Sequence, residues 1–184
     1  MTIYKPDGLF AFGNAQTVEL PINGARPDTA NDATQKAPLG TLYRFKGNLF
    51  RYVLFNSGTN AVAAVQYGVA HWLAAGLDPS VGLFTVTSDH LSALGGVNTV
   101  AGILGAVVTS GNYTWVQVGG IATAKCAVSF VAGDVAVGGA TDLTFTRIAA
   151  DSSITSISYG TATASRDGSG NDTFLLESHR LASL

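Results

Sequence analysis

Charged side chains are scarce in this sequence. Asp, Glu, Lys and Arg together make up 12% of the 184 residues, and the formal net charge is −2. Proteins that bind nucleic acids concentrate Lys and Arg on one face to meet the phosphates, so this composition argues against a nucleic-acid partner. A surface with so few charges leaves neutral, apolar area in water unless other proteins cover it. We therefore expect the chain to contact other protein subunits.

Cysteine and long hydrophobic runs are also nearly absent. Cys126 is the single cysteine, which excludes an intramolecular disulfide and a cysteine-rich zinc site, and we expect it to be buried. The most apolar window, residues 97–108, is interrupted by Asn98, Thr99 and glycines. It falls short of the roughly 20 residues that a transmembrane helix needs. The beginning of the sequence, MTIYKPDGLFAF, lacks the features of a secretory signal. We predict no membrane partner.

Sequence patterns that carry catalysis or bind cofactors are missing. The glycine pairs have no phosphate-loop context, and neither a nucleophile elbow nor a metalloprotease helix motif occurs. The histidines His71, His90 and His179 lack a second ligand at the spacing that metal sites use. Ser88, Asp89 and His90 are the residue types of a hydrolytic triad, but adjacent residues point in different directions and cannot act in series. We predict no catalytic residue, no cofactor and no metal.

Two carboxylates, Asp134 and Asp142, flank a short predicted strand. Both stand beside glycine or threonine, so we expect turn roles for them and not a pair of catalytic acids. A β-barrel enzyme or a lectin is an alternative from another functional class. It would require carboxylates and aromatic side chains that gather in one cleft.

Residues 1–39 differ from the rest of the chain. Four of the five prolines fall here, among Asn, Asp, Thr and Ala, and no apolar period of 2 or 3.6 is sustained. We predict an extended N-terminal arm over residues 1–39 and a β-rich body domain over residues 40–184. An edge strand added to the chain's own body is the alternative for the arm. The apolar side chains of a free arm need cover from a neighbouring subunit or a partner. The candidate partner-binding residues are Tyr4, Leu9, Phe10, Phe12, Val18 and Leu20.

The body shows a succession of short strands and turns. Residues 41–55 alternate aromatic or aliphatic residues with Arg and Lys around Lys46-Gly47-Asn48, which predicts a hairpin with a tight turn at positive φ. Residues 61–76 are ambiguous, because their alanines favour a helix while Gly68 and the β-branched residues favour two short strands. Residues 113–130 predict two strands that meet at Gly119-Gly120. Further strands are expected within residues 82–89, 100–108, 134–139 and 141–150, and in the tail after residue 150.

Turn signals at intervals of roughly eight to twelve residues are typical of sandwiches and barrels. The fold that we expect is all-β, with mainly short antiparallel strands in a sandwich-like, barrel-like or β-tulip-type arrangement. A chain with few charges protects its strand edges most simply by pairing them between subunits. We therefore expect symmetric self-assembly.

Three segments carry a resemblance to a known family. GTLYRFKGNLFRYVLF, YTWVQVGG and VAGDVAVGG resemble, in this order and separation, the body of bacteriophage capsid decoration proteins, which cement the outside of an expanded head. The likeness spans residues 40–150. It implies a β-rich homotrimer that binds the major capsid protein through its arm and stabilises the shell. It also implies synthesis in the host cytoplasm, a final place on the capsid exterior of the virion, and no catalytic residues.

The alternative function is a phage tail, fibre or baseplate component whose β-domain binds the host. Receptor-binding surfaces usually expose Trp, Tyr and Arg. In this chain Trp72 and Trp115 fall in strand-like runs, where we expect them to be part of the core.

Overall fold

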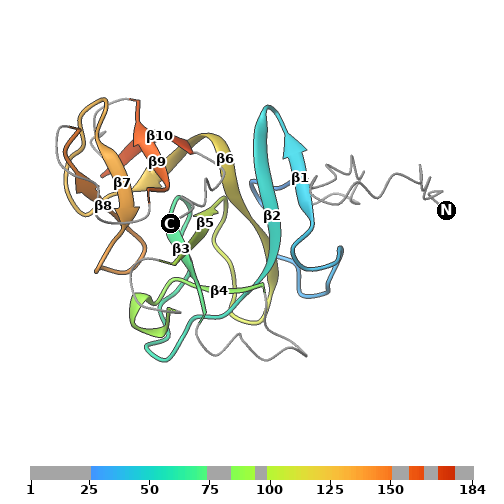
Figure 1. Ribbon diagram of the computed structural model, residues 1–184. Helices are drawn as coiled ribbons and strands as arrows, with labels where there is room; N and C mark the ends of the chain where they lie inside the picture. Colours follow the sequence, from blue (N-terminus) through green and yellow to red (C-terminus); the bar gives the residue numbers. More distant parts are fainter. Residues whose placement is uncertain (1–25, 74–83, 94–98, 151–157, 164–169, 177–184) are drawn as a thin grey trace, which may run out of the picture.

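β-Strands and turns make up the described part of the chain (Figure 1). The computed structural model describes residues 26–73, 84–93, 99–150, 158–163 and 170–176. These residues form ten strands, one short 3₁₀ helix and no α-helix, so the all-β prediction is confirmed. The strands are β1 (Leu42–Phe45), β2 (Asn48–Phe55), β3 (Val69–Trp72), β4 (Thr85–Thr87), β5 (Val100–Leu104), β6 (Tyr113–Lys125), β7 (Val135–Gly138), β8 (Phe145–Ile148), β9 (Gly160–Ala162) and β10 (Asn171–Leu176). The 3₁₀ helix η2 is His90–Ser92.

Five strands close a small mixed barrel. β2 pairs with β4 in parallel, and the pairs β4–β3, β3–β5, β5–β6 and β6–β2 that complete the ring are antiparallel. Closure gives every strand of the ring two neighbours, which removes exposed edges. An apolar cluster to which all five strands contribute fills the barrel. Its members include Val53, Phe55, Ala70, Val86, Leu104 and Val116.

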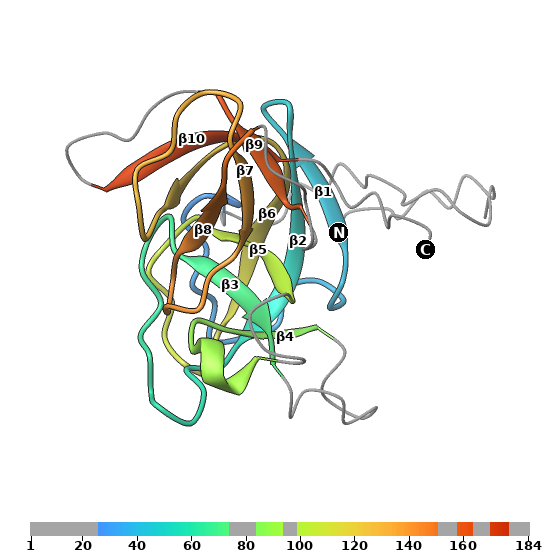
Figure 2. The same ribbon diagram turned by 60° about the vertical axis from the view of Figure 1, so that its left-hand side comes forward.

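Strand β6 continues beyond the barrel into a second sheet, whose strand order is β6-β10-β9-β7-β8 (Figure 2). The first part of β6 pairs with β2 and residues 120–125 pair with β10. Gly120 lies at the junction with φ of +87°, a left-handed conformation that glycine adopts at little cost. The prediction of two strands that meet at Gly119-Gly120 is therefore wrong. The chain bends there without interrupting the strand, because different neighbours pair with its two halves.

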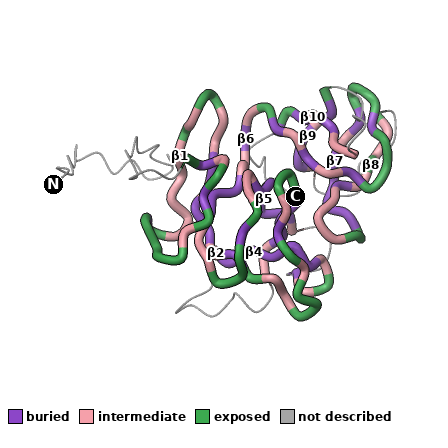
Figure 3. Tube along the Cα trace, turned by 180° about the vertical axis from the view of Figure 1, so that it is seen from behind, coloured by how far each residue is buried: buried purple, intermediate pink, exposed green. Residues whose placement is uncertain are grey.

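The two sheets share one apolar core. Val69 and Ile103 from barrel strands belong to the same buried cluster as Phe145 and Phe174 from the second sheet. Phe174 makes edge-on ring contacts with Phe130 and Phe145, at 5.0 and 5.4 Å between ring centroids. Figure 3 shows the resulting pattern, with buried residues along the strands and exposed residues mostly in the turns.

Most local predictions agree with the structure. Phe45 and Asn48 are paired in the β1–β2 hairpin, and Lys46 and Gly47 between them have φ of +49° and +83°. Within residues 61–73, the described part of the ambiguous segment, the structure has strand β3 and no helix. The other expected strands are present but shorter than the segments that predicted them. The expected core residues Cys126 and Trp115 are buried, and Trp72 is partly buried against the barrel cluster.

Candidate functional site

The predicted partner-binding residues belong to a part of the chain whose structure is not described. Tyr4, Leu9, Phe10, Phe12, Val18 and Leu20 all lie outside the described residues. Their role as contacts to a partner therefore stays a prediction.

The described part of the expected arm, residues 26–39, packs on the body. Asp32 and Tyr113 exchange two main-chain hydrogen bonds of 2.9 and 2.8 Å, which form a single antiparallel bridge to β6. The main-chain N–H of Lys36 donates to the Tyr52 hydroxyl at 3.0 Å. Two small residues of the segment are buried in an aromatic cluster that comprises Ala30, Ala37, Phe50, Tyr52 and Trp115. The arm is predicted over residues 1–39, and for residues 1–25, which lie outside the described residues, it stays a prediction.

A groove of about 250 Å³ lies beside residues 28 and 29. Its lining combines residues 28 and 29 with apolar side chains that include Phe45, Tyr67 and Ile103. Asp28 is the one carboxylate among the described lining residues, and Arg26 pairs with it at 2.7 Å. A glycosidase or lectin site would need several carboxylates in the cleft, and this groove supplies one that is already paired.

The outer face of the second sheet exposes apolar side chains. One line of directly paired residues crosses all five strands of this sheet, and we call it the outer row. The outer row comprises Ile121, Leu175, Thr161, Val135 and Ile148. Ile121 is 63% exposed and Leu175 is 47% exposed. Their chain neighbours Ala122 and Phe174 point to the opposite side, into the shared core. Thr161, Val135 and Ile148 are partly buried, so the exposed apolar part of the outer row is the pair Ile121 and Leu175.

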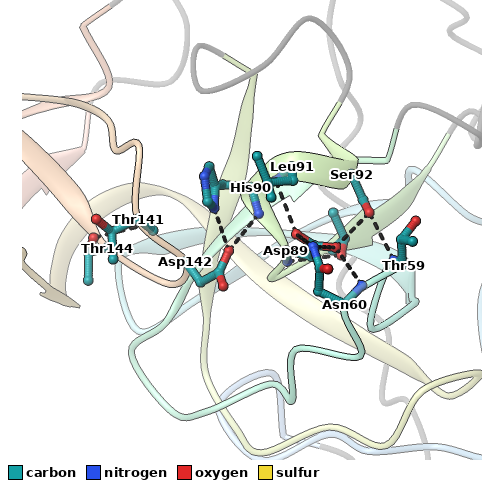
Figure 4. Close-up of polar contacts among 10 residues, drawn as sticks. Thr59, Asn60, Asp89, His90, Leu91, Ser92, Thr141, Asp142 and Thr144 are labelled. Carbon is teal, nitrogen blue, oxygen red and sulfur yellow. Dashed lines mark hydrogen bonds and ion pairs between the residues drawn. The ribbon is translucent and has the colours of Figure 1, made fainter.

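A polar cluster surrounds Asp89 at the beginning of η2 (Figure 4). Asp89 is buried, and its carboxylate accepts hydrogen bonds from the main-chain N–H of Leu91, the Ser92 hydroxyl and both nitrogens of Asn60. Burial alone would raise the pKa of Asp89, but the donors from Ser92, Asn60 and Leu91 outweigh it and hold the pKa well below the usual range. The ionised side chain ties the 58–60 turn to η2.

His90 and Asp142 form the second half of this cluster. The main-chain N–H of His90 and its Nδ1 both contact Asp142 Oδ1, at 2.9 and 2.6 Å. These contacts tie η2 to the loop before β8. The sequence did not predict this pair, because the two residues are 52 positions apart and no spacing motif links them. Asp134 does have the predicted turn role, since it accepts from the main-chain N–H of Val131 at 2.8 Å.

His71 on β3 lies between the segments that carry His90 and Asp142. It pairs with Thr87 on β4, and two residues earlier on β3 the main-chain N–H of Val69 donates to the carbonyl of Leu143. The His71 ring is fully buried, and neither nitrogen has a hydrogen-bond partner. The pKa of His71 is lowered to about 4, mainly by burial and also by nearby His90, while nearby Asp142 opposes the shift. At neutral pH the imidazole is uncharged.

This cluster does not supply a complete metal centre. Asp89, His90 and Asp142 place one potential ligand atom each within 4.8 Å of the others, the one such group found among the described residues. The hydrogen bonds already occupy both Asp89 oxygens and His90 Nδ1. One ring nitrogen of His90 and one oxygen of Asp142 are left, whereas zinc sites use three or four protein ligands. The geometry is that of a structural tie between loops.

The same residues do not form a hydrolytic triad. The Ser88 hydroxyl is buried without a hydrogen-bond partner, so it does not donate to His90. Asp89 accepts from Asn60, Leu91 and Ser92 and not from the His90 ring. A triad needs the nucleophile, the base and the orienting acid to be hydrogen-bonded in series. Of the two hydrogen bonds that join such a triad, the structure has the one between His90 and an acid, and that acid is Asp142.

Comparisons of the chain with models of protein families, with curated proteins and with solved structures found no match. Among the described residues no helix has the length and hydropathy of a bilayer-spanning segment.

Proposed function

We propose that this chain is a non-enzymatic structural protein of a bacteriophage virion. In this proposal it assembles as a homotrimer, binds the major capsid protein on the outside of the head and stabilises the shell. It is made in the host cytoplasm and acts on the capsid exterior. Residues 1–25, with the six candidate contacts, reach the capsid surface, while the barrel and the second sheet form the body that caps it.

The observation that carries the proposal is the exposed apolar pair Ile121 and Leu175. These residues are direct partners on β6 and β10, and they are 63% and 47% exposed. Paired apolar side chains at such exposure favour a surface that other protein chains cover. The sequence resemblance to decoration proteins favours a capsid as the assembly that this chain joins. Its three segments fall on the β1–β2 hairpin, on β6 and on β7.

The placement of the aromatic residues weighs against the host-binding alternative. Trp115 is fully buried, and Trp72 is partly buried against Phe84 and the barrel cluster. A receptor-binding β-domain would need such anchors on its surface loops. In this chain both tryptophans stabilise the barrel.

The test is cosedimentation of the purified protein with expanded empty heads of the phage that encodes it. Full-length protein is compared with a variant that begins at Arg26 and with the full-length double variant Phe10→Asp, Phe12→Asp. The truncation stops at residue 25 because residues 26–39 contribute Ala30 and Ala37 to the aromatic cluster of the body. We expect full-length protein to pellet with the heads and both variants to stay in the supernatant with unchanged melting temperatures.

The matched control is Val107→Glu. It places a charge on an exposed apolar residue of the body, since Val107 is 66% exposed. It should pellet as the wild type does. Wild-type protein that stays in the supernatant would contradict the capsid proposal as a whole. Unchanged binding by both arm variants would contradict only the role of residues 1–25.

A further inference from the structure

We infer that the open edge of β1 binds an extended segment of a different protein chain, in which acidic and apolar residues alternate. The segment adds a strand to the sheet beside β1. This inference goes beyond the proposed function, in which residues 1–25 make the capsid contacts.

The outer edge of β1 has main-chain groups without partners. Figure 1 shows β1 beside β2, the one described strand with which it pairs. The hairpin turns after Phe45 through two residues, so Phe45 and its partner form a hydrogen-bonded pair, and every second pair along the ladder does the same. The hydrogen bond of 2.9 Å from the main-chain N–H of Tyr52 to the carbonyl of Thr41 fits this alternation. The N–H and C=O groups of Leu42 and Arg44 therefore point away from β2, and no described residue bonds to them there.

The opposite end of the strand order is protected. There residues 127–129 border β8. The main-chain N–H of Ala127 donates to the carbonyl of Phe145 at 3.1 Å, and Arg147 Nη1 donates to the carbonyl of Ser129 at 3.2 Å. An unpaired edge is a template for an added strand, because an extended main chain supplies donors and acceptors in the matching alternation. Of the two ends, β1 is thus the one that is open to another strand.

The segment that contains this edge is positively charged. Residues 33–77 include Lys36, Arg44, Lys46 and Arg51 but no Asp or Glu. None of these four side chains forms an ion pair with a described residue, since the ion pairs there involve other cations. Arg44 and Lys46 are exposed, and Arg44 lies on the same face of the hairpin as Arg51, at a diagonal distance of about 7–8 Å. Neighbouring cations without anions favour an acidic partner.

The side chains of β1 specify the pattern of the added strand. A residue directly opposite Arg44 has its Cβ atom about 5 Å away, which suits Glu or Asp. Tyr43 and Phe45 point to the other face of the hairpin, where they pack against the aromatic cluster of the body and are only partly buried. Apolar residues on either side of the acidic residue extend this cluster. An alternation of acidic and apolar residues therefore matches β1.

The same charges disfavour a second copy of this chain as the occupant. Two paired β1 strands would bring Arg44 and Lys46 close to their own equivalents along a ladder of four residues, and opposed like charges are destabilising. A charged residue on a short edge strand is a common protection against such self-pairing. An acidic strand meets attraction where a second β1 meets repulsion, so the edge selects a different chain.

The experiment is an NMR titration of the full-length protein with a short capped peptide that alternates valine and glutamate. We expect the amide resonances of Leu42 and Arg44 to shift. Their hydrogen exchange should slow about tenfold at a peptide concentration about ten times the dissociation constant. Two peptides of the same length are the controls, one with lysine in place of glutamate and one with glycine in place of valine. Neither should shift these resonances at the same concentration.

Charge reversal at the edge tests the role of Arg44. Arg44→Glu should weaken binding of the valine–glutamate peptide at least about tenfold, because it replaces an attraction with a repulsion. Lys125→Glu is the matched control with the same change in net charge, since Lys125 lies on β6, outside the hairpin, and it should bind as the wild type does. If Arg44→Glu does not fold, Arg44→Gln removes the charge alone and should weaken binding about threefold. Far-UV circular dichroism verifies the fold of each variant.

Several results would overturn the inference. They are the absence of shifts at Leu42 and Arg44, equal binding of either control peptide, and an equal loss of binding in Lys125→Glu. Slow exchange of the Leu42 and Arg44 amides in the free protein would also overturn it, because the chain's own arm or a second copy would then fill the edge. The titration contains no capsids, so its outcome is separate from the cosedimentation test of the proposed function.

Discussion

At the scale of single residues, the most unusual environment belongs to His71. Its ring is fully buried on β3, and both nitrogens lack hydrogen-bond partners. Burying a charge without a partner is far more costly than burying a neutral imidazole. The facing ionisable groups, His90 and Asp142, act in opposite directions on its pKa, so burial decides that the ring stays neutral. At pH values between about 4 and 6.5, His71 thus packs as an uncharged residue that takes up a proton only when the chain unfolds.

This environment predicts acid sensitivity of the fold. Unfolded histidine has a pKa of 6.5, whereas folded His71 has a pKa of about 4. Between these values the unfolded chain binds a proton that the folded chain does not, so stability falls as the pH decreases through this window. The full effect is about 3 kcal/mol. Urea unfolding at pH 7 and pH 4.5 should show most of this loss in the wild type and little of it in His71→Leu.

A loss of equal size in His71→Leu would contradict the assignment to His71. The titration of Asp89 does not interfere with this comparison between pH 7 and pH 4.5. Its pKa is lowered in the fold, so its contribution is present above the ordinary Asp value of 3.8 and is lost only as the pH falls below that value. The two pH windows therefore adjoin without overlapping.

At the scale of elements, β6 decides the architecture. One end of this 13-residue strand pairs with β2 in the barrel, and the other end pairs with β10 in the second sheet. The bend between them depends on Gly120, where a Cβ atom would lie 3.0 Å from the Cα atom of Asn48. A side chain at this position meets two obstacles, the left-handed backbone conformation and the neighbouring main chain.

We expect Gly120→Ala to destabilise the protein by more than the conformational cost alone, which is about 1–3 kcal/mol. Gly111→Ala is the matched control, because Gly111 has the same φ of +87° and nothing lies within 4 Å of its Cβ position. Urea unfolding of both variants isolates the contact with Asn48 as the difference between their free energies of unfolding. Equal losses in the two variants would show that β6 shifts at Gly120 without cost.

The accuracy of each sequence prediction depends on how far apart in the sequence the residues that determine the feature lie. The β1–β2 hairpin was predictable because its alternation and its turn residues lie within 15 adjacent positions. The continuity of β6 was not, because it depends on pairing with β2 and β10, which are far away in the sequence. The pair His90 and Asp142 was missed for the same reason. The outer row became visible only with the register, since Ile121 and Leu175 are unremarkable as separate residues.

At the scale of the whole molecule, the barrel and the second sheet form one packed body. Besides sharing β6, they share a core in which Val69, Val100 and Ile103 from the barrel contact the cluster of Phe145 and Phe174. Residues 26–39 cover the aromatic cluster around Tyr52 and Trp115. The shared strand and the shared core thus hold the two sheets in fixed relation.

The shared core predicts a single cooperative unfolding transition. Phe174→Ala in the second sheet should lower the free energy of unfolding by about 3–5 kcal/mol, because it leaves a cavity beside Phe130 and Phe145. Both tryptophans lie on barrel strands, so their fluorescence reports the barrel, while far-UV circular dichroism reports all strands. The urea midpoints from the two signals should decrease together, whereas Val131→Ala, a change at an exposed loop residue, should leave both unchanged. A fluorescence midpoint that stays at the wild-type value in Phe174→Ala would mean that the barrel unfolds independently of the second sheet.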